Sequence, residues 1–255
     1  MKPNLAIVMV VENGLEYTRA ALESVKTKYP YKIVIIDNYS TDGTKEWLAS
    51  RKDIHSVIDP EGSTGLAYNW NLGIKEATRL RCNRFLMLSN DILLHSEYID
   101  NLMARYDKGD VTLMSGYNIE CDYPEQIFFK EIESFDDQPN AGFSCFMLST
   151  DTIDKIGWLD ENIRKIYWED VDYATRIELA GEKHIVYRGS ISYHYGSATL
   201  NRIATPEQQN EIHRNYALNQ EYIMRKWGND SRITKEIYQT PWNIENKSIK
   251  ECNES

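Results

Sequence analysis

Apolar runs alternate with segments of helical apolar spacing along the first half of the chain. The runs at 5–11, 33–36 and 85–88 are typical of buried strands. Between the first two, Thr18, Ala21, Leu22 and Val25 recur at helical spacing and predict one apolar stripe. This alternation predicts a parallel sheet covered by helices. Further predicted elements are a short helix through 47–48, a strand near 57–58, helices over 65–80 and around 99–106, and a strand at 111–114.

Two helix starts carry residues typical of caps. Asn13 precedes the first helix, with Glu16 in the reciprocal capping-box position. Thr205 as cap and Pro206 at the first helical position predict a long helix that ends near 227–228.

The later pattern gives the domain organisation. The alternation becomes irregular over 117–140, which we interpret as an acceptor-facing wall. The polar tail beyond Trp242 is expected to be disordered. We expect one domain over 1–228, with a nucleotide-binding half at about 1–115, an acceptor and catalytic half at about 116–228, and a polar extension over 229–255.

Composition narrows the class of partner. The 255 residues, 42% of them hydrophobic, are enough for a substantial core. A formal charge of −10 opposes tight attachment to phosphate backbones, so nucleic acid is not expected as a partner. Four cysteines, at 82, 121, 145 and 252, show no metal-ligand or disulfide spacing, which favours a reducing cytoplasm.

No apolar stretch approaches membrane-spanning length, and the N-terminus leads directly into the first strand. We therefore expect a soluble protein, with contact at the inner membrane face left open.

Polar residues follow two predicted strands at their carboxyl ends, where open α/β sheets bind ligands. Asp37 and Asn38 end the second strand, while Asn90 and Asp91 follow the run at 85–88. An Asp at the first position can accept from a pyrimidine imide N–H. Alternatively, residues 37–43 form a turn that bonds its own backbone.

Gly65 precedes the 65–80 helix, whose free N–H groups and dipole favour a diphosphate. A plain connecting loop is the commoner explanation of such glycines, and no Walker or dinucleotide fingerprint is present. The polar Asn69 and Asn71 favour a site.

Asp91 with His194 is a candidate pair of ligands for Mg²⁺ or Mn²⁺. The imidazole favours Mn²⁺ over Ca²⁺, and the small number of protein ligands argues against structural zinc. Alternatively, His194 is a hydrogen-bonded histidine on a strand.

Acidic residues cluster at the start of a helix predicted to end at Gly181. Glu169 and Asp170 are candidate catalytic carboxylates, although an acidic start also complements the helix dipole. Trp168 either stacks on a sugar or staples the helix start. Asp172 and Arg176, four residues apart, are interpreted as a structural pair. The apolar side of this helix is expected to carry Val171, Ala174 and Ile177.

Taken in order over about residues 4–200, these motifs resemble family 2 of the inverting glycosyltransferases, which have the GT-A fold. The resemblance implies an α/β protein with a single Rossmann-like, mostly parallel sheet flanked by helices, an irregular acceptor-side region and a C-terminal helix. The motifs are Asp37-Asn38-x-Ser40-Thr41-Asp42-Gly43, Gly65-Leu66-Ala67-x-Asn69-x-Asn71-x-Gly73, Asn90-Asp91, Gly157-x-Leu159-Asp160-Glu161, Glu169-Asp170-x-Asp172-x-x-x-Arg176 and His194-x-Gly196.

The resemblance also implies roles. Asp170, beside Glu169, would deprotonate an acceptor hydroxyl, and Asp91 and His194 would hold a metal–diphosphate complex, with Trp168 facing the acceptor. Uridine or thymidine diphosphate sugars are favoured as donors, and the sugar would be transferred with inversion. The expected nucleotide-binding residues are Val11, Asp37, Asn38, Gly65, Asn71 and Asn90.

Two positions depart from the family pattern. The first strand ends Val10-Val11-Glu12-Asn13, where the family shows Pro followed by a small polar residue, so Glu12 is expected to face the nucleotide. Ser89 and Asn90 stand before Asp91, so the metal motif lacks its first acidic residue.

Other functions stay open from the sequence. A catalytically silent protein that binds nucleotide sugars or glycans is the main alternative, because fold does not fix function. A pyrophosphorylase would need a Gly-rich basic loop after the first strand, and Glu12-Asn13-Gly14 is not one. The acceptor is expected to be a glycan, a lipid-linked oligosaccharide or a surface polymer; the sequence does not specify the donor sugar or the oligomeric state.

Overall fold

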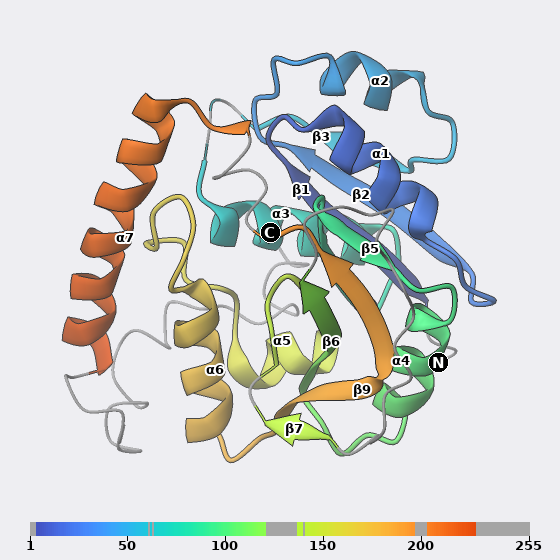
Figure 1. The fold of residues 1–255 in the computed structure, drawn as a ribbon. Coiled ribbons are helices and arrows are strands. Elements are labelled where there is room, and N and C mark those ends of the chain that lie inside the picture. The colour runs from blue at the N-terminus through green and yellow to red at the C-terminus, as the bar shows by residue number, and fades with distance from the viewer. Residues whose placement is uncertain are drawn as a thin grey trace.

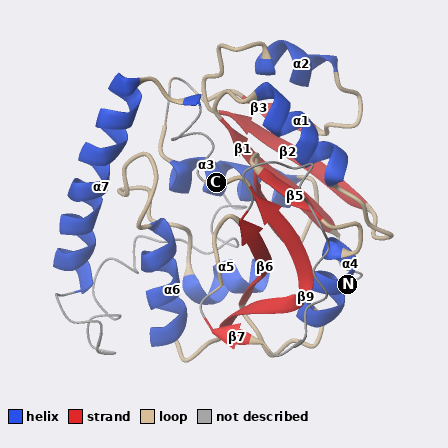
Figure 2. Ribbon diagram, viewed as in Figure 1, coloured by secondary structure: helices blue, strands red, loops and turns tan. Residues whose placement is uncertain are grey.

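A computed structural model describes residues 4–60, 62, 64–120, 137–139, 141–196 and 203–227 of the chain. Helices and strands alternate through the first part, as the apolar pattern predicts (Figures 1 and 2). The elements are β1 (Leu5–Val11), α1 (Leu15–Ser24), β2 (Tyr31–Asp37), α2 (Thr44–Ser50), β3 (Ser56–Ile58), α3 (Leu66–Arg79), β4 (Arg84–Ser89), β5 (Ile92–Leu94), α4 (Tyr98–Tyr106), β6 (Leu113–Glu120), β7 (Gln138–Pro139), β8 (Cys145–Ser149), α5 (Thr150–Ile156), α6 (Glu169–Leu179), β9 (His184–His194) and α7 (Pro206–Trp227).

One mixed, mostly parallel sheet runs through the molecule in the order β3-β2-β1-β4-β8-β6-β9-β5. The strands β3, β2, β1 and β4 are parallel, β8 is antiparallel to both of its neighbours, and β6 and β9 are again parallel. Short β5 and β7 pair antiparallel with β9. The parallel strands end at one edge, so the residues that follow them lie together there.

Two apolar layers cover the sheet because successive strand residues point to opposite faces. In β1, Leu5, Ile7 and Met9 pack with α1 and α4, whereas Ala6 and Val8 pack with α3, α5 and α6. All five β1 residues are fully buried, which explains a continuous apolar run in place of alternation.

The start of α1 is capped differently from the expectation. Asn13 is not the cap: Gly14 holds that position in a left-handed conformation, without a side-chain cap of its own. The Asp42 carboxylate accepts from the backbone N–H groups of Gly14 (2.7 Å) and Leu15 (3.0 Å). Burial opposes ionisation of Asp42, but hydrogen bonds from Thr44, Leu15 and Gly14 together lower its pKa. A residue of the next turn therefore caps this helix.

Other boundaries follow the sequence more closely. The Thr205 hydroxyl accepts from Gln208 N–H and the Gln208 side chain accepts from Thr205 N–H, which confirms the predicted start of α7. The irregularity expected from residue 117 begins later, because β6 continues to Glu120 beside β9. Residues 121–136, which carry most of the predicted acceptor wall, and the tail from 228 lie outside the described residues. The division near residue 115 stays a prediction.

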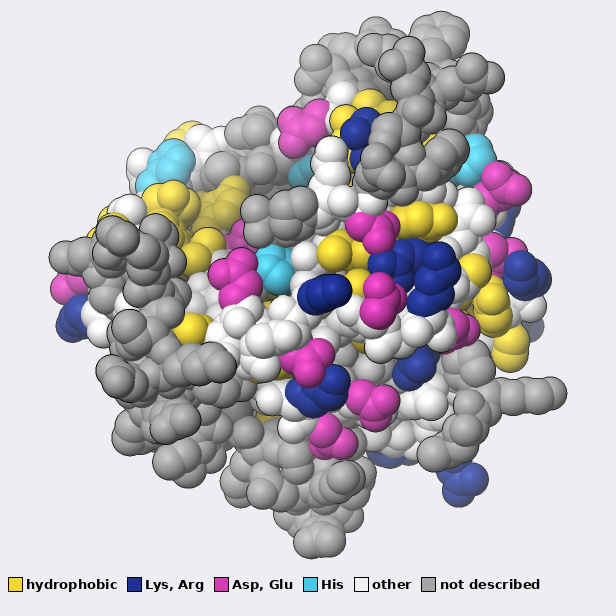
Figure 3. All heavy atoms as spheres, turned by 90° about the horizontal axis from the view of Figure 1, so that it is seen from below, with side chains coloured by type: hydrophobic (Ala, Val, Ile, Leu, Met, Phe, Trp, Pro, Cys, Tyr) yellow, Lys and Arg dark blue, Asp and Glu magenta, His cyan; other side chains and the backbone are white. Residues whose placement is uncertain are grey.

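Charges of both signs are interspersed on the face shown in Figure 3, among the side chains coloured there. Among the helices that the structure describes, none is long and apolar enough to cross a membrane.

Candidate active site

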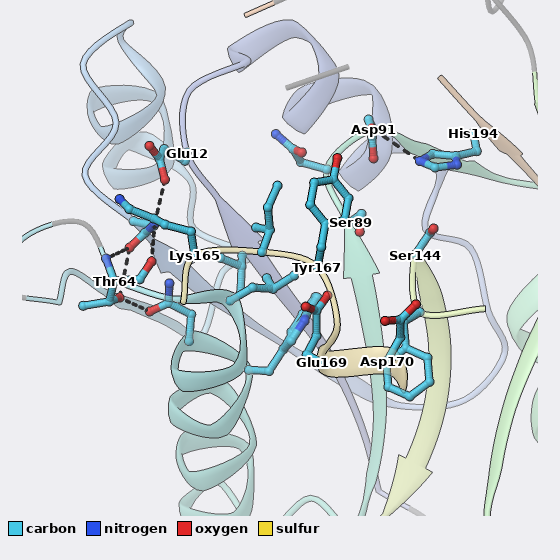
Figure 4. Close-up of a pocket in the computed structure, with 18 residues that line it drawn as sticks. Glu12, Thr64, Ser89, Asp91, Ser144, Lys165, Tyr167, Glu169, Asp170 and His194 are labelled. Carbon is cyan, nitrogen blue, oxygen red and sulfur yellow. Dashed lines mark hydrogen bonds and ion pairs between the residues drawn. The ribbon is translucent and has the colours of Figure 1, made fainter. Parts of the chain in front are cut away.

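A cavity of about 290 Å³ lies at the carboxyl ends of β1, β2 and β4. Figure 4 shows three groups on its wall: Glu12, Thr64 and Lys165 on one side, Asp91 and His194 on another, and Glu169 and Asp170 at the start of α6. The structure thus brings together six of the predicted site residues, which are Asn38, Asn90, Asp91, Glu169, Asp170 and His194.

Asp91 and His194 meet although 103 positions separate them in the sequence, because β5 pairs with β9 and aligns Ile92 with His194. His194 Nε2 lies 3.4 Å from Asp91 Oδ2, and His194 Nδ1 lies 4.0 Å from an oxygen of the exposed Glu120. Burial lowers the pKa of His194, but the hydrogen bond and charge of Asp91, with Glu120, outweigh it and raise the pKa above its ordinary value.

The donor set of this pair fits a divalent cation that takes its remaining ligands from elsewhere. A carboxylate and an imidazole converge on the cavity wall, and such a mixed set suits Mn²⁺ or Mg²⁺. Within the described part of the chain, no group of three His, Cys, Asp or Glu side chains forms a complete metal site. A cation held here would therefore need phosphate or water oxygens.

On another side of the cavity, Asn38 organises the polar residues. Its Nδ2 donates to Glu12 Oε2 (2.7 Å), and its Oδ1 accepts from the backbone N–H (2.8 Å) and hydroxyl (3.0 Å) of Thr64. The Thr64 hydroxyl also lies 2.7 Å from Asn69 Oδ1. This network connects the ends of β1 and β2 to the start of α3, and Glu12 lines the cavity.

Asp37 and Val11 lie behind this wall. Val11 is fully buried, and Asp37 is 1% exposed. Asp37 Oδ1 accepts from Ser40 N–H (3.1 Å), while its buried Oδ2 has no hydrogen-bond partner in the structure. Neither residue lines the cavity, but a buried carboxylate oxygen without a donor beside Asn38 is suited to an incoming N–H or hydroxyl group.

Gly65 and Asn71 contribute to packing and to buried hydrogen bonds within the fold. A Cβ at Gly65 would lie 3.1 Å from the Ile163 carbonyl oxygen, so a glycine lets the start of α3 approach the 163–165 loop. Asn71 is fully buried and bonds Leu159 through both backbone groups, with its Nδ2 also donating to Glu161 Oε1. Neither residue lines the cavity.

The two acidic residues at the start of α6 differ in burial. Asp170 is exposed on the cavity wall, whereas Glu169 is 8% exposed, and its Oε2 has no hydrogen-bond partner in the structure. Burial, and secondarily the charge of Asp170, raise the pKa of Glu169 to about 8. Glu169 is therefore protonated at neutral pH and is a poor base.

Farther along α6, the predicted Asp172–Arg176 pair is present but fully buried. Val171 is 42% exposed, so the expectation that it lies on the apolar side with Ile177 is wrong. The charged pair takes that inward position because Lys226 and Trp227 of α7 bond Asp172.

Trp168 precedes α6 with a left-handed φ of 80°. It is partly buried against a small cluster of α7 residues, its ring centroid 5.5 Å from that of Tyr216. Trp168 does not line the cavity, whereas its neighbour Tyr167 does.

The loop before α6 also supplies Lys165 and Ile166 to the cavity. Left-handed backbone at Lys165 (φ 54°) and Tyr167 (φ 74°) turns these side chains inward. Nothing in the local sequence predicts that geometry, since neither residue favours such a φ. In the sequence, Lys165 and Ile166 are marked only by their position just before the acidic start of α6.

Comparison with known proteins supports one family. Residues 6–169 match the model of glycosyl transferase family 2. A low-salt glycan biosynthesis hexosyltransferase, Agl10 of Haloferax volcanii, is 26% identical over 57% of this chain and 52% of its own length. Chondroitin synthase of Pasteurella multocida is 27% identical over 71% of this chain. The chain spans about half of the first relative and only 23% of the second.

Solved structures show the same fold. A mannosyltransferase from Pyrobaculum calidifontis, in complex with GDP-Man and Mn²⁺, superposes with a TM-score of 0.64 at 13% identity over 96% of this chain and 71% of that one. GalNAc-T7 with UDP, GalNAc and Mn²⁺ gives 0.62 at 15% identity over 98% and 54%. These GT-A proteins confirm the predicted fold class.

Proposed function

The chain belongs to glycosyl transferase family 2, and from that premise we propose that it transfers a sugar, with inversion, from a nucleotide diphosphate to an acceptor hydroxyl. The observation that carries the proposal is the single cavity that joins Asn38, the Asp91–His194 pair and Asp170. Nucleotide binding, diphosphate stabilisation and proton removal each need a separate group, and the cavity holds one for each.

Asp170 is the proposed general base. Its carboxylate is exposed to the cavity. Among the described residues, its Oδ1 accepts a hydrogen bond from the N–H of the next residue, Val171. The first turn of α6 also places free backbone N–H groups beside it, which favour a carboxylate. Glu169, protonated at neutral pH, supports the site by limiting the negative charge around Asp170.

Asp91 and His194 are the proposed ligands of Mn²⁺ or Mg²⁺, which would neutralise charge on the departing nucleoside diphosphate. Asp91 contributes a hard oxygen and His194 a nitrogen. Their mutual contact orients the carboxylate and the imidazole to the same side of the cavity.

The nucleotide is proposed to lie against Asn38 and Glu12, with its base directed toward the buried Oδ2 of Asp37, which lies behind Asn38 and has no hydrogen-bond partner in the structure. A carboxylate oxygen there would accept the imide N–H of uracil or thymine, which favours UDP- or dTDP-sugars. We further propose a glycan or surface polymer as acceptor, in keeping with glycan biosynthesis by the Haloferax relative. The cytoplasm is the proposed place of action.

Exchange of Asp170 for Asn tests the proposal. We expect sugar transfer, measured as UDP or dTDP release from a panel of donors with Mn²⁺ and mixed glycoside acceptors, to fall by ~10²-fold or more. Nucleotide affinity, measured by calorimetry, should change little, because Asn keeps the size of the side chain.

Glu178→Gln is the matched control, since Glu178 lies farther along α6 with 63% of its side chain exposed. It should retain full transfer. Equal loss of transfer and nucleotide binding in Asp170→Asn would contradict the role as base. Nucleotide binding by wild-type protein with no transfer to any acceptor would favour a silent binding protein.

A further inference from the structure

α7 ties down both ends of the segment that forms one wall of the cavity. The Lys226 ammonium lies 2.7 Å from Asp160 Oδ2 and 2.8 Å from Asp172 Oδ1, with only 1% of its side chain exposed. The Tyr222 hydroxyl also donates to Asp160 Oδ2 (2.7 Å). Segment 160–172, which contains Glu169 and Asp170, is therefore fixed at two points to one helix.

Asn219 fixes the middle of the same segment. Its Oδ1 accepts from Arg164 N–H (2.9 Å), and its Nδ2 donates to the carbonyls of Arg164 (2.8 Å), Tyr167 (3.1 Å) and Ile166 (3.2 Å). The residue is 1% exposed. Since the left-handed backbone of this loop forms no helix or sheet ladder, one side-chain amide supplies the bonds that secondary structure supplies elsewhere.

The side chains that this loop presents are those facing the cavity. Lys165 is the one lysine or arginine among the described residues that line it. Figure 4 shows its side chain directed toward the Glu12 and Thr64 side. The Lys165 carbonyl accepts from Leu66 N–H (2.6 Å), so the loop backbone is also joined to the start of α3.

Lys165 lies among acidic side chains, where its positive charge favours binding of a diphosphate. The described cavity wall carries the acidic residues Glu12, Asp91, Glu169 and Asp170, and a nucleoside diphosphate brings further negative charge. In the structure, Lys165 Nζ lies 4.0 Å from Glu211 Oε1 of α7, whose side chain is 52% exposed. An ion pair with so exposed a partner contributes little to stability, so this contact would not oppose binding of the ammonium to a phosphate.

We propose that Asn219 is a positioning residue, which fixes the 164–167 loop so that the Lys165 ammonium binds the nucleoside diphosphate on the Glu12 side of the cavity. The inference rests on the proposed function, since it requires a nucleotide in this cavity. It gives α7, which lies beyond the residues 6–169 matched by the family, a part in donor binding.

The experiment compares Asn219→Asp and Lys165→Met with the control Asn215→Ala. Aspartate keeps the shape of Asn219 but cannot donate to three carbonyls, and methionine removes only the charge of Lys165. Asn215 lies one turn earlier on α7 and is similarly buried, at 9%. The readouts are the Kd for UDP and for dTDP with Mn²⁺, amide hydrogen exchange over 164–167, and melting temperature.

We expect both test variants to weaken nucleotide binding by at least about tenfold, as for loss of a hydrogen bond to a charged group. Only Asn219→Asp should also accelerate exchange over 164–167, and Asn215→Ala should do neither. A folded Asn219→Asp with wild-type affinity or wild-type exchange would overturn the inference.

Lys165→Met decides the matter if Asn219→Asp does not fold, because methionine leaves the backbone bonds of the loop to Asn219 intact. Wild-type affinity in Lys165→Met would overturn the inference while leaving the proposed function in place. Failure of the wild-type protein to bind any nucleotide would overturn both.

Discussion

The two walls of the cavity are held by different forces. The wall at the ends of β1, β2 and β4 stands on fully buried apolar strands, such as Leu5–Met9, packed between helices. The wall formed by 160–172 is held instead by buried charge and amide groups of α7, chiefly Lys226 and Asn219. Apolar packing tolerates small shifts, whereas a buried charge that loses its partner carries a large penalty.

Removal of the Lys226 charge should have the largest effect on stability and so distinguish the two walls most clearly. Lys226→Met leaves Asp160 without this cation and leaves Asp172 with Arg176 and the Trp227 N–H, so we expect a loss of ~3–5 kcal/mol in the free energy of unfolding. Burial opposes ionisation of Asp160, and Lys226 is the first of the groups that nevertheless lower its pKa. Urea denaturation measures the effect.

Lys155→Met is the control, because Lys155 pairs with Glu182 at the surface with 55% of its side chain exposed. It should cost less than ~1 kcal/mol. Similar small losses in both variants would show that the α7 network is not what holds this wall.

Burial of Glu169 should make the stability of the protein depend on pH. Glu169, with its pKa raised to about 8 by burial and Asp170, keeps its proton in the folded protein after the unfolded chain has released it near 4.5. Wild-type stability should therefore fall as pH rises from about 4.5 to 8, whereas Glu169→Gln escapes that loss. At ~1.4 kcal/mol per pKa unit, the variant should gain a few kcal/mol relative to wild type by pH 9.

Thermal or urea unfolding across that pH range measures the difference. Glu23→Gln, on the exposed side of α1, should show no such trend. A constant difference between Glu169→Gln and wild type from pH 5 to 9 would rule out a retained proton at this position.

The smallest effect should come from the apolar wall. A Cβ at Gly73 of α3 would lie 2.2 Å from Val8 Cγ1 of β1. Gly73→Ala should therefore cost ~1–3 kcal/mol through overpacking, reduced by up to ~1 kcal/mol from the better helix propensity of alanine.

Gly142→Ala is the matched control, since the nearest atoms to its Cβ would lie 4.0 Å away. Denaturation midpoints of the two variants give the comparison. If Gly73→Ala were as stable as Gly142→Ala, the close approach of α3 to β1 would have no energetic weight.

The two walls also differed in how far the sequence predicted them. Asp91, Asn90 and Asn38 could be placed because a buried strand ends just before each, and strand ends share an edge. The inward geometry of Lys165 and Tyr167 could not be predicted, since the side-chain amide of Asn219, more than 50 positions away, bonds the backbone of their loop. Local sequence pattern predicts local structure, whereas the shape of the 160–172 wall depends on contacts between residues far apart in the sequence.

The same distinction explains the errors. Asn13 resembled a cap, but the carboxylate of Asp42, 29 positions later, accepts from the helix start instead. Asp172 and Arg176 were correctly paired, yet their burial, and with it the exposure of Val171, depends on Lys226 and Trp227. Both of these errors trace to a polar side chain whose partner is remote in sequence.

The bonds between the first two turns bear on how this protein could be redesigned. Asp42 holds the backbone of Gly14 and Leu15, Asn13 Oδ1 accepts from Thr41 N–H (2.7 Å), and Ser40 accepts from Asn13 N–H (2.8 Å). The β1–α1 and β2–α2 turns thus form one cross-braced unit. A graft intended to alter which base is accepted would have to carry both turns together, because either one alone would arrive without the partner that gives it its shape.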